Sequence, residues 1–99
     1  MQQSGNTVEA STKQLLSKQE LDVKAKLEQM IKDLDAENFR VEMIEIESNR
    51  KTFEVYCNRQ EDRGKLIGKN GRNINALQIL LKAYAMPRGV IFSGIHVND

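Results

Sequence analysis

The order of apolar and polar residues predicts a helix, two strands, two helices and a final strand. The first helix should begin at Ser17, because Ser17 and Glu20 have the spacing of a capping box. Apolar residues then recur at helical spacing, at Val23, Leu27, Met30, Ile31 and Leu34. Asn38 suits a left-handed position just past the end of this helix. We expect the apolar stripe to cover a sheet, since a small domain needs it for its core.

Two strands are expected after the first helix. Residues 39–47 alternate apolar and charged side chains, and the adjacent pair Met43 and Ile44 predicts a bulge or partial burial on both faces. Residues 52–58 alternate cleanly, so the two strands should pair as a hairpin. One face of the second strand carries Phe53, Val55 and Cys57. Cys57 is then expected to be a small buried residue without a reactive role.

The second half of the chain predicts two helices and one strand. Asn58 can cap a short helix that runs into Leu66 and Ile67. Apolar spacing predicts the next helix, from Ile74 through Leu77, Leu81 and Tyr84 to about Ala85, with Pro87 and Gly89 past its end. Residues 90–97 are rich in β-branched and aromatic side chains, which predicts a last strand. Residues 1–16 are mostly small and polar, so we expect a flexible extension ahead of a single domain at residues 17–99.

Composition narrows the classes of protein to consider. A chain of 99 residues with 39% hydrophobic content makes one domain. It has no stretch near the roughly 18 apolar residues of a membrane span and no signal segment, so we expect a cytoplasmic protein. One cysteine and one histidine supply no metal-ligand set, and no cofactor is expected. No spacing joins a nucleophile, a base and an orienting acid, which argues against an enzyme.

Charge is segregated along the chain although the net charge is only +1. Over residues 35–47, five acidic residues against one arginine leave a net charge of −4. Over residues 59–72, five basic residues against two acids leave +3. A local basic patch fits a polyanionic ligand, and it fits an ordinary solvated surface about equally well.

The basic patch coincides with a glycine-containing turn between the two later helices. It reads Leu66-Ile67-Gly68-Lys69-Asn70-Gly71-Arg72-Asn73-Ile74. The two glycines permit positive φ or close backbone approach, and the following helix offers unpaired N–H groups and a positive dipole end. Lys69 and Arg72 add full charges beside them, so a phosphate would be held well there.

Two familiar phosphate-binding loops do not fit this turn. A Walker A loop needs four residues between its first glycine and Gly-Lys-Ser/Thr, whereas three separate Gly64 from Gly68, and Asn70 follows Lys69. A dinucleotide-binding loop follows a strand and has closer glycine spacing than Gly64, Gly68 and Gly71. Neither nucleotide hydrolysis nor dinucleotide binding is therefore expected.

The pattern Ile-Gly-Lys-x-Gly-x-x-Ile between two helices resembles the KH domain. The order of elements is similar to the type II, bacterial form, and the segment Asn75-Ala76-Leu77-Gln78 resembles KH domains of the KhpA and Jag/KhpB kind. This resemblance covers about residues 17–99. It implies an α+β fold of αββααβ order, with a three-stranded mixed sheet covered on one face by three helices.

The resemblance also implies single-stranded RNA binding without catalysis, as a post-transcriptional regulator or RNA chaperone. In KH domains the glycine loop lies against the backbone of about four nucleotides, beside a groove for the bases. The implied RNA-binding residues are Lys65, Ile67, Gly68, Lys69, Asn70, Gly71, Arg72, Asn73 and Ile74. For the helical wall of the groove the candidates are Leu66, Ile67, Ile74 and Leu77, and for its strand wall they are Phe53 and Val55. Each apolar candidate fits the core at least equally well.

The sequence is compatible with several partners besides RNA. A single module should bind modestly, so a second KH protein is expected to help, as a homodimer or heterodimer. Single-stranded DNA is an alternative ligand. An alternative of another class is a protein-interaction module, in which the first helix or an open strand edge binds a partner.

Overall fold

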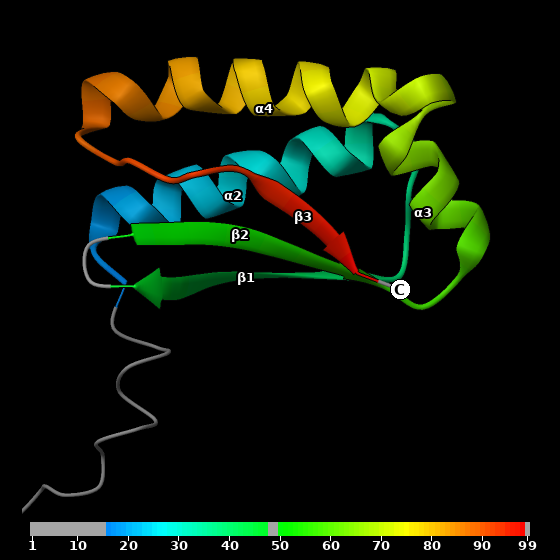
Figure 1. Ribbon diagram of the computed structural model, residues 1–99, viewed down its shortest axis with the longest axis horizontal. Coiled ribbons are helices and arrows are strands. Elements are labelled where there is room, and N and C mark those ends of the chain that lie inside the picture. The colour runs from blue at the N-terminus through cyan, green and yellow to red at the C-terminus, as the bar shows by residue number, and fades with distance from the viewer. Residues whose placement is uncertain (1–15, 48–49, 99) are drawn as a thin grey trace, which may run out of the picture.

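A computed structural model describes residues 16–47 and 50–98, and these form one α+β unit (Figure 1). The expectation of a flexible extension over residues 1–16 falls outside the described residues except for Leu16, which packs against the core. None of the described helices is long and apolar enough to cross a bilayer.

The first described helix, α2 (Lys18–Asp33), has the predicted start. Ser17 Oγ accepts from the N–H of Glu20 at 3.0 Å, and Glu20 Oε1 accepts from the N–H of Ser17 at 2.9 Å. The face toward the sheet buries Val23, Leu27 and Ile31 completely. Asn38 does adopt positive φ, at 54°, as expected, and Asp35 joins it at 66°. Two left-handed residues thus turn the chain from the helix into the sheet.

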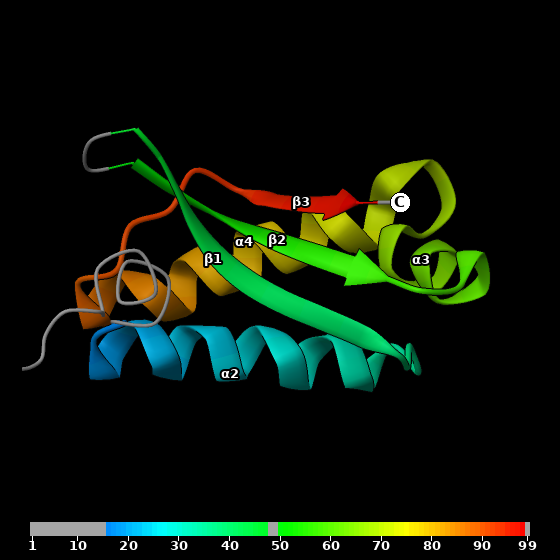
Figure 2. The same cartoon turned by 90° about the horizontal axis from the view of Figure 1, so that it is seen from below.

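The sheet contains β1 (Phe39–Glu47), β2 (Arg50–Cys57) and β3 (Ile95–Asn98), in that spatial order. As predicted, β1 and β2 form an antiparallel hairpin; β3 pairs with β2 in parallel, so the sheet is mixed. Figures 1 and 2 show α2 and α4 over one face of this sheet, with α3 at its end. The αββααβ order and the mixed sheet therefore match the type II KH arrangement.

Of two further predictions about the strands, one was confirmed in part and one was wrong. At Met43 and Ile44 there is no bulge, but the alternative of partial burial on both faces is confirmed, because Met43 faces the core and Ile44 lies half-buried on the other face; the register shift in β1 lies between Glu45 and Glu47. The last strand spans Ile95–Asn98 only, instead of residues 90–97. Val90 and Phe92 are apolar because both are buried in the core and not because they belong to a strand. The rings of Phe92 and Phe53 pack edge to face, with their centroids 5.0 Å apart.

The second half continues with α3 (Gln60–Ile67), the short 3₁₀ turn η1 (Lys69–Gly71) and α4 (Arg72–Ala85), followed by the 3₁₀ turn η2 (Met86–Arg88). Asn58 does not cap α3: Arg59 holds that position without a side-chain cap. Asn58 instead donates its N–H to the carbonyl of Asn38 at 3.3 Å, which keeps it in the hairpin. On α4, Leu77 and Leu81 are buried and Ile74 and Tyr84 are half-buried, so the predicted stripe faces the sheet.

Candidate nucleic-acid interface

The backbone of the glycine loop is held in conformations that suit its residues. Gly68 has φ 77° and ψ 173°, a region that only glycine populates readily. Asn70 (φ 58°) and Gly71 (φ 75°) are both left-handed, which asparagine and glycine tolerate better than other residues. The loop is therefore encoded by these three residues, whose backbone reverses direction between α3 and α4.

Gly68 also lets the two helices approach closely. A Cβ atom at Gly68 would lie 2.7 Å from Asn73 Cγ and 2.9 Å from the Asn73 backbone nitrogen. Asn73 Nδ2 in turn donates to the carbonyl of Lys65 at 2.8 Å, across the junction of α3 and α4. At Gly71, by contrast, a Cβ would meet only a methyl of Ile74 at 3.9 Å, so this side of the loop is open.

The loop leaves donors available for a ligand. The N–H groups of Gly68, Gly71 and Arg72 are bonded within the turn, to the carbonyls of Gly64, Gly68 and Lys69. Those of Lys69 and Asn70 make no bond to the described residues. They belong to the residues just before the first turn of α4, where helical N–H groups lack intrahelical partners and favour an anion.

Charge at the loop is concentrated in two side chains. Lys69 and Arg72 are exposed and form no ion pair with any described residue. Two other basic residues of the patch are engaged: Arg59 pairs with Glu61 at 2.8 Å, and Lys65 donates to the carbonyl of Asp35 at 3.1 Å. Fewer free positive charges are therefore available to a polyanion than the net charge of +3 over residues 59–72 suggested.

Of the predicted groove residues, the structure leaves Ile67 and Ile74 half-buried beside the loop. The other four candidates lie in the core: Leu66, Phe53 and Val55 are fully buried, and Leu77 is 5% exposed. Phe53 and Val55 cannot form an open wall because they belong to the middle strand and point toward the helices. The assignment of Phe53 and Val55 to the groove wall was wrong, and the alternative of a core position is confirmed for all four residues.

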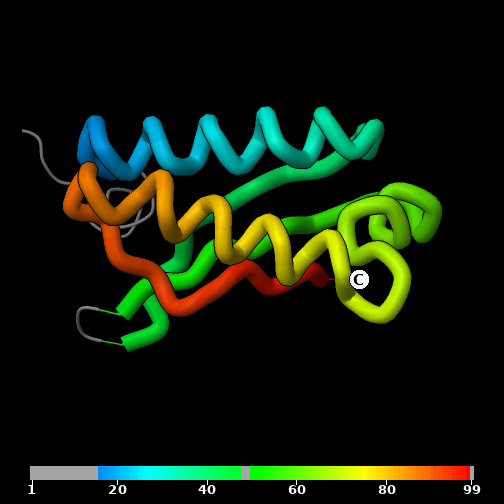
Figure 3. The backbone as a smooth tube through the Cα atoms, turned by 90° about the horizontal axis from the view of Figure 1, so that it is seen from above, coloured from blue at the N-terminus to red at the C-terminus, as the bar shows by residue number. Residues whose placement is uncertain are grey.

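The strand that does lie beside α4 is β3, at the edge of the sheet. Figures 2 and 3 show it running along α4, with its C-terminal end toward the loop. Gln78 Oε1 accepts from the N–H of Ile95 at 3.0 Å and so ties the start of β3 to α4. Since N–H directions alternate along a strand, the N–H of Val97 faces the same open edge.

Sequence reasoning missed β3 and Gln78 as parts of this region. The available signal was Gln78 itself, a polar residue one turn from both Ile74 and Leu81 on the core-facing side of α4. A polar side chain in such a position needs a bonding partner, and here the partner is the strand edge.

A glycine loop joining two helices on a mixed αββααβ sheet defines a type II KH domain, a class that binds nucleic acids and is not enzymatic. Comparison with family models agrees. The chain belongs to the KH family whose model is described as KhpA/KhpB, KH domain, which matches residues 24–90, more than half of the chain. KhpA and KhpB are RNA-binding proteins. Comparisons with curated proteins and with solved structures gave no match.

Proposed function

We propose that this protein binds single-stranded RNA at the loop Gly68-Lys69-Asn70-Gly71, as a post-transcriptional regulator or RNA chaperone in the cytoplasm. The observation that carries the proposal is the pair of unbonded N–H groups at Lys69 and Asn70, flanked by the two unpaired cations. Such donors suit the phosphate oxygens and the 2′-hydroxyl of a strand of about four nucleotides.

The remaining predicted residues take different parts in this proposal. Gly71 lets the RNA backbone approach on its open side, and Arg72 contributes a phosphate contact. Ile67 and Ile74 offer apolar surface to the bases beside the loop. Lys65 and Asn73 are already bonded, so we assign them to holding the loop, with Gly68 between them.

The test is a double substitution, Lys69→Asp with Asn70→Asp, measured by fluorescence anisotropy on a short single-stranded RNA at low salt. Aspartate tolerates the left-handed conformation of Asn70, so the fold should survive. The matched control, Lys18→Glu with Gln19→Glu, makes the same change in net charge at the first turn of α2, where acids are favourable.

We expect RNA binding to be lost in the loop variant and kept in the control. Equal affinities of wild type and loop variant would overturn the proposal. An equal loss in both variants would also overturn it, because total charge and not the loop would then govern binding. The same oligonucleotide as DNA shows whether the 2′-hydroxyl is read.

We further propose that a second KH unit joins through the outer face of α4. Apolar side chains are exposed there, with Ile79 at 70% and Leu80 at 58% exposure, and Met86, the first residue of η2, is 75% exposed. Ala76 and Ala83 lie on the same face and allow close approach of another helix. Light scattering after size-exclusion chromatography should show a dimer that Leu80→Glu converts to a monomer; a monomeric wild type at every concentration would refute this.

A further inference from the structure

Within residues 16–47 and 50–98, no strand pairs with β1 on the side away from β2, so β1 is an edge of the sheet. Asn58 donates to Asn38 across the hairpin, and Phe53 donates to Gly94 on the other side of β2. Bonding directions alternate along a strand, so the even-numbered residues of β1 bond to β2. The N–H and C=O groups of Phe39, Val41 and Met43 therefore point outward, where a further strand could pair with them.

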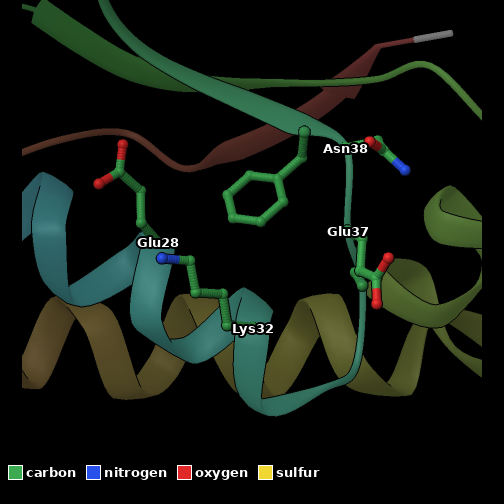
Figure 4. Close-up of a pocket in the computed structure, with 6 residues that line it drawn as sticks. Glu28, Lys32, Glu37 and Asn38 are labelled. Carbon is green, nitrogen blue, oxygen red and sulfur yellow. The ribbon is translucent and has the colours of Figure 1, made fainter.

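A hollow of about 550 Å³ lies between this edge and α2. Its lining residues are Glu28, Lys32, Ala36, Glu37, Asn38 and Phe39. Figure 4 shows Glu28 and Lys32 reaching in from α2, and Glu37 and Asn38 on the segment that leads into β1. Phe39 is half-buried and Ala36 is buried, so the floor of the hollow is apolar. If an extended segment paired with β1, one of its apolar side chains could occupy this hollow.

Charge decides which occupant fits this edge. Residues 35–47 carry five acidic side chains against one arginine. Glu37 and Glu45 are exposed and form no ion pair with the described residues, whereas Lys32 is the one unpaired cation among the residues that line the hollow. RNA would be repelled here. A second copy joined through the same edge would set these acids against each other, which disfavours self-pairing.

We propose that β1 and α2 bind an extended, lysine- or arginine-rich segment of a partner protein, which adds as a fourth strand to the sheet. Backbone hydrogen bonds to Phe39, Val41 and Met43 supply the pairing, as in other cases of strand addition. This surface is separate from the glycine loop, so the inference goes beyond RNA binding and does not depend on it.

The geometry of the edge specifies the side-chain pattern of the partner. Side chains of an added strand alternate between the two faces of the sheet. Those on the helical face meet Phe39 and Ala36, and so should be apolar. Those on the opposite face lie beside half-buried Glu42, whose Oε2 is 3.1 Å from Arg40 Nε, and basic side chains at the two ends of the segment reach the unpaired Glu37 and Glu45, which precede and follow the pairing residues 39–43. A segment in which basic and apolar residues alternate satisfies both faces.

The probe is the acetylated synthetic peptide Lys-Val-Lys-Val-Lys-Val-Lys, titrated into the full chain and followed by isothermal titration calorimetry and by amide NMR shifts. We expect saturable binding that shifts the amides of residues 37–45 and leaves those of residues 68–72 in place. No saturable binding, or shifts centred on another surface, would overturn the proposal.

Two N-methylated forms of the peptide separate strand addition from simple charge attraction. Methylation of alternate residues blocks either the N–H groups that face β1 or those that face solvent. One form should therefore lose binding while the other keeps it. Equal binding by both forms would show that no ladder forms and would refute the proposal.

Variants of the protein test the choice of a basic partner. Glu37→Lys with Glu45→Lys should weaken peptide binding by about tenfold, whereas Lys32→Glu should strengthen it. Asp33→Lys is the matched control, since Asp33 is exposed on the side of α2 that bears Gln29, away from β1. Circular dichroism checks that each variant folds. If Asp33→Lys weakened binding as much per charge as the edge variants, the interaction would not be located at β1.

Discussion

Replacing Gly68 with alanine should destabilise the fold far more than any other glycine substitution near the loop. The φ and ψ of Gly68 lie in a region where an L-residue is strained by about 1–3 kcal/mol. The added Cβ would also press on Asn73 at 2.7–2.9 Å, and such overpacking typically costs about 1–3 kcal/mol. Together these effects amount to about 2–6 kcal/mol, a large share of the 5–15 kcal/mol that stabilises a typical domain.

Two neighbouring glycines provide matched controls for Gly68→Ala. At Gly71 the left-handed backbone alone opposes a side chain, by about 1–2 kcal/mol, because the nearest atom would be 3.9 Å away. Gly64 lies inside α3, and a Cβ added there would have no atom within 4 Å, so alanine at this position should stabilise the helix by about 0.5–1 kcal/mol.

Urea unfolding followed by circular dichroism measures all three variants on one scale. The expected order of stability is Gly64→Ala above wild type, then Gly71→Ala, then Gly68→Ala. If Gly68→Ala were no less stable than Gly71→Ala, the close approach of α3 and α4 at Asn73 would not be real. Gly71→Ala should in addition weaken RNA binding, since its methyl group stands on the open side of the loop.

Further predictions concern buried and charged groups. Asp62→Ala should destabilise the protein by about 1.5–3 kcal/mol in urea unfolding, because buried Asp62 accepts from the N–H of Glu37 at 2.9 Å; Asp62→Asn, which keeps an acceptor, should lose less. Burial and the nearby Asp62 charge raise the pKa of Cys57, so this thiol should react with a disulfide reagent only on unfolding. Arg72→Ala should lower the salt slope of RNA binding by about 0.7. Burial acts to raise the pKa of Glu20, but hydrogen bonds from Lys51 and Ser17 and the Lys51 charge lower it overall. The loss of stability in Lys51→Ala should therefore be present at neutral pH and vanish as pH falls below 4.5 in acid unfolding curves.

Local signals in the sequence were sufficient for most of the elements. The capping box at Ser17 and the helical spacing from Val23 onward fixed α2, and strict alternation fixed which face of β2 is buried. The glycine loop was recognisable because Gly68 and Gly71 both need conformations that other residues resist. In each case the determining interactions lie within a few residues of one another.

Errors arose where the determining contact was distant in sequence. Asn58 is a good capping residue, yet its N–H is bonded to Asn38, twenty positions earlier. The groove wall was assigned to Phe53 and Val55 because alternation identifies the faces of a strand but not its position in the sheet. That β2 lies in the middle depends on parallel pairing with β3, and no pattern within β2 records it.

The net charge of the protein is only +1, yet we propose an anionic ligand, RNA, at the glycine loop and a cationic ligand, a basic peptide, at β1. The pairing of charges within the protein makes these two proposals compatible. Most described basic residues have a local partner. Some form ion pairs, as Lys18 Nζ does with Asp22 Oδ2 at 3.3 Å, and others stack on aromatic rings, as Arg88 does with its Cζ 3.7 Å from the centroid of the Tyr84 ring. Lys69 and Arg72 stay uncompensated at the loop, while Glu37 and Glu45 stay uncompensated at the β1 edge. Salt screens the interaction between exposed charges over about 8–10 Å. The charge preference of each surface therefore depends on its own unpaired groups and not on the net charge of the protein. Under the two proposals, the anionic strand and the cationic peptide therefore use separate surfaces of the same small domain and should not compete.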